Sequence, residues 1–222
     1  MESELLLHLG CSFQVYKPEL RDKLLEELQK IEPHLKLYTK CCKQMPNLSE
    51  GTLVYNDCTG CHRRFSLEYA GLSSRTIWEV IDGIEGFPLP TYEGMVVSVH
   101  DSCGFRGQPS VHKAVRSLLA KMKIAVVESA FHSEKSICCG HQFYGKLPEE
   151  KVFALQKKRA EQFPCEMVVT TCVSCVKSLQ SGGRVPKHLL DLIFEEETNP
   201  YPVEYAVCEA KKQDFRESQK EV

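Results

Sequence analysis

The chain has 222 residues, with 28 basic and 30 acidic side chains, a net charge of -2 and twelve cysteines. This length suits one large domain or two domains of about 100 residues each. Balanced charge argues against a nucleic-acid-binding protein and against a polybasic membrane-surface protein. No apolar run reaches the roughly 20 residues that span a bilayer, and the short, acidic start at residues 1–9 is unlike a signal peptide. We therefore expect a cytoplasmic protein with no membrane span and no nucleic-acid partner.

The first half of the chain alternates predicted strands with predicted helices. Short apolar segments predict strands over residues 4–9, 35–38 and 52–55. Helical spacing of apolar residues predicts helices over 20–31 and around the stripe 77–81. A group of cysteines follows each strand: Cys11, then Cys41 with Cys42, then Cys58 with Cys61.

The second half repeats this order of elements and cysteines. Strands are predicted over residues 95–99, 124–127 and 167–170, and helices over 111–122, 149–162 and the stripe 189–193. The cysteines are again a single residue, an adjacent pair and a C-x-x-C motif: Cys103, Cys138 with Cys139, and Cys172 with Cys175. Such self-similarity indicates two copies of one structural unit.

The two halves differ in one spacing. The segment between Cys139 and Cys172 has room for the helix over 149–162, whereas the segment between Cys42 and Cys58 is about half as long. We therefore predict that the first half lacks this helix.

Alternating strands and helices predict an α/β fold, built from two pseudo-repeated βαβ-type units with short parallel sheets flanked by helices. The carboxyl ends of parallel strands share one edge, where ligands usually bind. With cysteines at the C-terminal ends of the strands, five thiols of each half are expected to converge there.

The predicted domains are 1–85, 86–200 and a polar C-terminal tail, 201–222, of which residues 209–222 are expected to be solvated. The junction between the first two lies in the Gly- and Pro-rich stretch 83–94.

Clustered thiols in a reducing compartment more often bind metal or carry out redox chemistry than form disulfides. Thiolates are soft ligands for zinc, copper(I) and iron–sulfur clusters. A structural zinc ion takes four ligands, which leaves a fifth thiol unused, and adjacent cysteines reach two metals of a cluster more readily than one ion. An iron–sulfur cluster is therefore favoured over zinc, more strongly in the second half.

Cys165 and Cys208 stand outside this pattern and are predicted to be buried small hydrophobic residues.

Three segments of the second half resemble a known family: Cys103, Cys138-Cys139-Gly140 and Cys172-x-x-Cys175. They are similar to the CCG-type cysteine-rich domain, which occurs twice in the B subunit of heterodisulfide reductase. Related domains occur in iron–sulfur subunits of anaerobic glycerol-3-phosphate, glycolate and lactate oxidation. The segments 100–103 and 116–119 also resemble this family, although Ser102 replaces the more usual proline.

The resemblance implies unusual non-cubane [4Fe–4S] clusters, one or two per chain. By position, the implied metal ligands are Cys11, Cys41, Cys42, Cys58 and Cys61, then Cys103, Cys138, Cys139, Cys172 and Cys175. It also implies an oxidoreductase of the heterodisulfide reductase B type, which reduces a disulfide or passes electrons within a complex. The first half departs from the pattern, because Lys43 stands where Gly140 follows the second pair.

Several other residues are candidates for a place beside the clusters. His62 and His141 are possible proton donors, although a surface position is expected for both; Arg63, Arg64 and Arg106 are expected to be solvated. Trp78 is predicted to lie in the core. No glycine-rich segment matches a dinucleotide fingerprint, so we infer no flavin or nicotinamide and expect electrons from a ferredoxin-like or flavoprotein subunit, with a small disulfide as a possible substrate.

Two other functions stay open. The chain is alternatively a non-catalytic electron-transfer subunit with one cluster, held by the second half. A zinc-stabilised binding module is the third possibility, which predicts a colourless protein that unfolds with a chelator.

Overall fold

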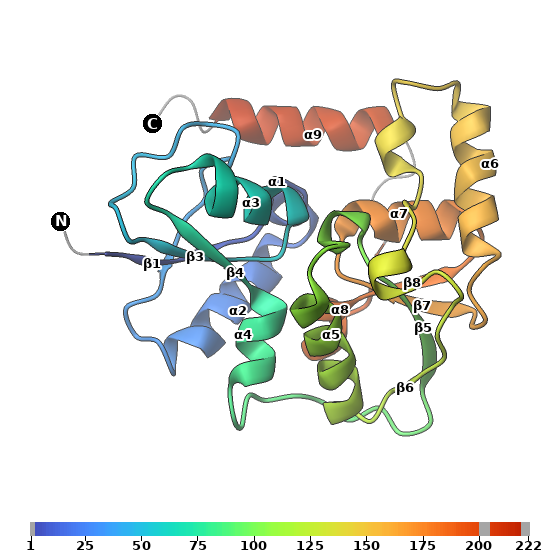
Figure 1. The fold of residues 1–222 in the computed structure, drawn as a ribbon, viewed down its shortest axis with the longest axis horizontal. Helices are drawn as coiled ribbons and strands as arrows, with labels where there is room; N and C mark the ends of the chain where they lie inside the picture. Colours follow the sequence, from blue (N-terminus) through green and yellow to red (C-terminus); the bar gives the residue numbers. More distant parts are fainter. Residues whose placement is uncertain (1–2, 200–204, 219–222) are drawn as a thin grey trace. The chain divides into compact units, whose positions relative to one another are not determined.

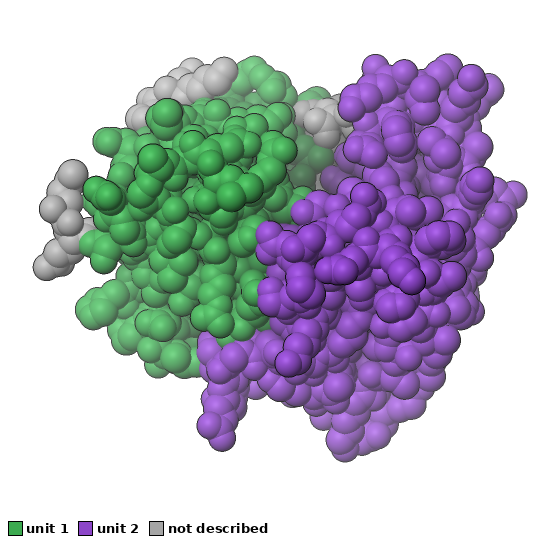
Figure 2. Space-filling model, in the orientation of Figure 1, with its two compact units in different colours: residues 1–80, 206–222 green, residues 81–205 purple. Residues whose placement is uncertain are grey.

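The computed structural model describes residues 3–199 and 205–218; within the last segment, side chains are described from residue 210 onward. The chain divides into two compact units, shown in Figure 2. Unit 1 comprises residues 1–80 and 206–222, and unit 2 comprises residues 81–205. The passage from one unit to the other falls within helix α4 (Ile77–Gly83).

Unit 1 contains a parallel sheet in the order β2-β1-β3-β4. Figure 1 labels three of these strands, β1, β3 and β4. Its strands are β1 (Leu5–His8), β2 (Lys36–Leu37), β3 (Leu53–Asn56) and β4 (Ser73–Thr76). Its helical segments are α1 (Cys11–Tyr16), α2 (Pro18–Gln29), α3 (Thr59–Arg63), the π-helical turn η1 (Arg64–Glu68) and α9 (Tyr205–Ser218). Helices α1 and α2, which lie between β1 and β2, provide the crossover connection that parallel neighbours require.

Unit 2 contains a second parallel sheet, in the order β6-β5-β7-β8. Its strands are β5 (Val96–His100), β6 (Ala125–Val126), β7 (Met167–Thr170) and β8 (Val185–His188). Its helices are α5 (Pro109–Lys121), α6 (Glu149–Ala160), α7 (Val173–Ser181) and α8 (Leu189–Ile193), with 3-10 turns η2 (Cys103–Phe105), η3 (Ser133–Lys135) and η4 (His141–Phe143). The strand orders match position for position, which confirms the predicted α/β fold with two parallel repeats.

Local sequence explains the long helices. Pro18 and Pro109 occupy the first positions of α2 and α5, where the missing N–H costs nothing. In α2, Leu20, Leu24 and Leu28 recur every fourth residue and are fully buried. Helix α6 confirms the helix predicted over 149–162, and no helix lies between β2 and β3, as predicted from the short spacing.

The sequence did not reveal the fourth strand of each sheet. The apolar stripes 77–81 and 189–193 lie in helices, as predicted, but these helices are α4 and α8, which follow the missed strands β4 and β8. Helices α3 and α7 begin inside the C-x-x-C motifs. Both missed strands are edge strands of polar composition, and Pro186 within β8 is typical of such an edge.

The polar C-terminal tail is helical in the part that the structure describes, and most of its described side chains are exposed. Residues 205–218 form helix α9, in which Lys212 is only 8% exposed. Within unit 1, the Gln44 side-chain amide donates to the Arg216 carbonyl oxygen at 3.4 Å, and the Arg216 guanidinium contacts the Cys11 sulfur at 3.6 Å. No helix among the described residues is long and apolar enough to cross a bilayer.

The packing of α2 yields a direct test. We expect Leu24→Ala to lower the free energy of unfolding by about 2–5 kcal/mol, because loss of the fully buried side chain leaves a cavity in the core. Urea denaturation monitored by circular dichroism measures this change. The control is Ile31→Ala, because Ile31 is 49% exposed, and its effect should stay within about 0.5 kcal/mol. Equal effects of the two substitutions would contradict the assigned core.

Candidate metal centres

The five thiols of unit 1 lie past the carboxyl ends of its strands. Cys11 begins α1 just after β1, and Cys58 is the N-cap of α3 just after β3. The pair formed by Cys41 and Cys42 follows β2 after a short loop. These elements bring the sulfur atoms into a continuous series of contacts, in the order Cys11, Cys41, Cys42, Cys61 and Cys58.

Within this series, the Cys61 thiol donates to the Cys42 sulfur at 3.2 Å. This contact joins the adjacent pair to the C-x-x-C motif, as the predicted convergence requires.

The five thiols of unit 2 form the equivalent series, in the order Cys103, Cys138, Cys139, Cys175 and Cys172. Cys103 starts η2 just after β5, and Cys172 is the N-cap of α7 just after β7. The pair differs from the expectation that it directly follows a strand, because residues 127–137, including η3, separate it from β6.

Each series places negative charge on one member of its adjacent pair. Hydrogen bonds from the thiols of Cys41 and then Cys61 lower the pKa of Cys42 to about 4. In unit 2, hydrogen bonds from the thiols of Cys103 and then Cys139 lower the pKa of Cys138 to about 2. The donating thiols of Cys61, Cys103 and Cys139 have raised pKa values, because each shares its proton with a neighbouring sulfur and is removed from water.

Two histidines that the sequence did not single out as site residues complete these groups. A ring nitrogen of His8 lies within 4.8 Å of the sulfurs of Cys42 and Cys61, and a ring nitrogen of His100 lies equally close to those of Cys139 and Cys175. Both rings are 1% exposed, and burial lowers both pKa values, that of His100 to about 3. The internal repeat could have identified both histidines, because each stands three residues before the single cysteine of its half.

In unit 1, close backbone approach fixes the position of the thiols. The Gly10 N–H donates to the Asp57 carboxylate at 2.7 Å, and a Cβ on Gly10 would lie 2.6 Å from the Cys58 Cβ, so only glycine fits there. The Tyr69 hydroxyl donates to the Cys42 carbonyl oxygen at 2.5 Å, which anchors the loop that carries the pair.

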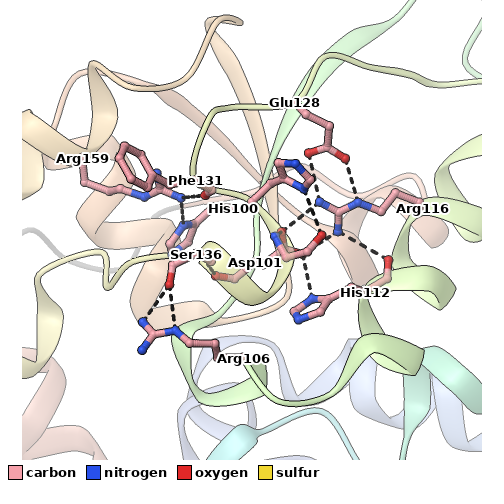
Figure 3. Close-up of polar contacts among 11 residues, drawn as sticks. His100, Asp101, Arg106, His112, Arg116, Glu128, Phe131, Ser136 and Arg159 are labelled. Carbon is pink, nitrogen blue, oxygen red and sulfur yellow. Dashed lines mark hydrogen bonds and ion pairs between the residues drawn. The ribbon is translucent and has the colours of Figure 1, made fainter.

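In unit 2, a network around Asp101 holds the segment that leads to the pair (Figure 3). The Asp101 carboxylate accepts hydrogen bonds from the Arg116 guanidinium at 2.5 and 2.8 Å, from a His112 ring nitrogen at 3.1 Å and from the Ser133 N–H at 2.6 Å. These donors lower the Asp101 pKa despite burial of the carboxylate, which opposes the shift. The Ser136 hydroxyl donates to the Asp101 carbonyl oxygen at 2.6 Å.

The adjacent pair of unit 2 ends in a left-handed turn. Gly140 has φ +98°, and its N–H donates to the Cys138 sulfur at 3.3 Å. Lys43, which holds the equivalent position in unit 1, is not among the described residues with positive φ. The backbone after the two pairs therefore follows different paths, in agreement with the sequence difference.

The sequence of unit 2 also matches a known protein family. Residues 97–180 match the family model of the CCG cysteine-rich domain. The match includes all five thiols of unit 2 and confirms the resemblance seen in the sequence. Those of unit 1 lie outside it. No curated protein gives a significant match to the chain. The cysteine groups and the CCG domain together mark a module capable of binding metal.

The other residues considered in the sequence differ in how well their predicted exposure agrees with the structure. His62 is 8% exposed and contacts the Ser74 hydroxyl at 3.2 Å, so the expected surface position was wrong; His141 is partly buried and its ring lies against that of Tyr144. Trp78 is fully buried, as predicted. The exposed Arg63 and the half-buried Arg64 pair with Glu68. The exposed Arg106 donates to the Ser136 carbonyl oxygen at 2.7 and 3.0 Å.

The two cysteines outside the repeat were predicted to be buried. Cys165 is partly exposed, so that prediction was wrong for it. It stands two residues before β7, and its backbone N–H donates to the Ser98 hydroxyl at 3.2 Å. The side chain of Cys208 lies outside the described residues.

The left-handed turn of the CCG domain gives one test. We expect Gly140→Ala to destabilise the protein by about 1–3 kcal/mol, because a side chain at positive φ is strained and its Cβ would lie 3.0 Å from the Gln156 side chain. Urea denaturation under anaerobic conditions measures the loss. Gly107→Ala is the matched control, since Gly107 has ordinary φ and open space around it. A Gly140→Ala protein as stable as the control would show that this turn imposes no constraint.

The Asp101 network gives a second test. Replacing Arg116 with Met should cost about 3–5 kcal/mol, because it leaves a buried carboxylate without its main cationic partner. Lys123→Met, which breaks the exposed pair between Lys123 and Glu93, should cost only about 0–1 kcal/mol. Urea denaturation of both variants measures the two changes in the free energy of unfolding. A smaller loss of stability in Arg116→Met than in Lys123→Met would refute the role of the network.

Proposed function

We propose that the protein is an iron–sulfur oxidoreductase subunit of the heterodisulfide reductase B type, in which each unit holds a cluster through its five thiols. The observation that carries this proposal is the repeated convergence of five sulfur atoms, in the same order, at the same edge of two sheets with the same topology. The family match of unit 2 supports it independently.

The residues fit a cluster better than a single ion. Five thiols exceed the four ligands of a structural zinc site, and thiolates are the ligands of iron–sulfur clusters. The side chains proposed to hold the clusters, of the non-cubane [4Fe–4S] type, are Cys11, Cys41, Cys42, Cys58 and Cys61 in unit 1, and Cys103, Cys138, Cys139, Cys172 and Cys175 in unit 2.

When bound, such clusters supply one-electron transfer. The chain itself supplies thiolates and a fixed, partly buried environment for them. Cys42 and Cys138 are already favoured as thiolates by their thiol neighbours. In unit 2, the buried guanidinium of Arg159 lies close enough to Cys139, Cys175 and Cys138 to interact with their charge, and a cation near sulfur favours its anionic form.

The proposed reaction is the reduction of a small disulfide. Two electrons and two protons convert one disulfide into two thiols, so the reaction requires an external electron donor. No dinucleotide fingerprint occurs in the sequence, and we therefore propose a ferredoxin-like or flavoprotein subunit as that donor. Transfer of electrons without disulfide turnover, through one cluster in unit 2, is the alternative that the experiment must separate.

The test uses the full chain purified anaerobically, with a reduced viologen as donor and a small aromatic disulfide as probe. We expect turnover in the wild type and a loss of about 10–100-fold or more in Cys138→Ala and in Cys139→Ala, because each removes a proposed ligand. Oxidation of the viologen measured optically reports the rate.

The matched control is Cys165→Ala, which removes a thiol outside the two series and should retain the wild-type rate. Unchanged turnover in both pair variants would refute the enzyme function. A reversible redox signal without turnover on any disulfide in the wild type would instead favour the electron-transfer alternative.

A further inference from the structure

The ring of His8 lies beside the thiols of unit 1, and its Nε2 has no hydrogen-bond partner among the described residues. Its Nδ1 lies 2.9 Å from the Tyr38 carbonyl oxygen. A carbonyl oxygen only accepts hydrogen bonds, so Nδ1 carries the ring proton, and Nε2 of the neutral ring is left with its lone pair. Nε2 is buried and has no hydrogen-bond partner among the described residues.

The surroundings of His8 fix this arrangement. The ring lies between those of Tyr38 and Phe65, with centroid distances of 5.6 and 5.4 Å, and its residue is 1% exposed. A ring nitrogen lies within 4.8 Å of the sulfurs of Cys42 and Cys61. A ligating histidine almost always donates its other ring N–H to a carbonyl, a carboxylate or water, and His8 already does so.

The ring of His100 has the opposite tautomer. Its Nδ1 lies 3.3 Å from Nη2 of Arg159. A guanidinium only donates hydrogen bonds, so Nδ1 of His100 accepts, and the ring proton is placed on Nε2. This Nε2 is likewise buried, without a partner among the described residues.

We propose that the two equivalent histidines have different roles: His8 binds a metal of unit 1 directly through Nε2, whereas Nε2 of His100, which no protein atom among the described residues accepts from, donates a hydrogen bond to sulfide of the centre proposed for unit 2. The inference rests on the proposed function in one respect, namely that each unit holds a metal centre. Imidazole and thiolate together suit both iron and zinc. The first centre therefore has mixed nitrogen and sulfur ligands, and the second has sulfur ligands with a hydrogen-bonded histidine.

X-ray absorption of the anaerobically purified full chain, at the edge of each metal that elemental analysis finds, tests the first role. We expect the outer-shell scattering of an imidazole in the wild type. His8→Gln should abolish it, because glutamine can still donate to the Tyr38 carbonyl oxygen but offers no ring nitrogen. His100→Gln is the matched control and should retain the imidazole signal.

A redox titration tests the second role. His100→Leu should lower the midpoint potential of the centre in unit 2, because hydrogen bonds to the sulfurs favour the reduced, more negative state. Circular dichroism of each variant establishes that it is folded.

The outcomes separate the inference from the proposed function. Bound metal without an imidazole signal in the wild type, loss of the signal in His100→Gln, or its persistence in His8→Gln would overturn the role of His8. An unchanged potential in His100→Leu would overturn the role of His100. A chain that binds no metal in either unit would contradict the proposed function itself.

Discussion

The contact of five sulfur atoms in each unit is the constraint on which the surrounding structure depends. Each series shares its protons so that one thiolate, at Cys42 or at Cys138, is stabilised by its neighbours. Burying such a charge without partners would be costly. The parallel strands bring the five thiols of each unit together, because their carboxyl ends meet at one edge of the sheet. The loops beyond those ends then have little freedom, as the close contact of Gly10 with Cys58 illustrates.

The two units reach the same arrangement by different means. Unit 2 supports its pair with the buried Asp101 network and with a left-handed turn at Gly140. Unit 1 has neither the additional helix nor the glycine. The Tyr69 hydroxyl anchors its pair, and Arg216 on α9 contacts Gln44, two residues after the pair, and the Cys11 sulfur. The two units thus share their five thiols but differ in the residues that hold the adjacent pair. Their proposed metal centres can therefore differ in properties. The opposite tautomers of His8 and His100 indicate one such difference.

Much of this arrangement follows from the sequence, because apolar periodicity and cysteine order are local signals. They were sufficient for three strands per unit, for α2, α5 and α6, and for the convergence of ten thiols. The edge strands β4 and β8 escaped detection because a strand paired on one side only needs no apolar pattern, as Pro186 shows. Helix α9 escaped because its polar sequence gives a weak stripe. The contacts of Asp101 and Arg159 join residues far apart in the chain, which no local pattern encodes.

The central claim is that both units bind metal through their thiols. Iron, zinc and acid-labile sulfide per chain, measured on anaerobically purified protein, test it most directly when the wild type is compared with two double variants, Cys41→Ala with Cys42→Ala and Cys138→Ala with Cys139→Ala. The account predicts about eight iron with matching sulfide in the wild type and about half in each double variant. Zinc without sulfide, or equal metal content in all three proteins, would contradict it.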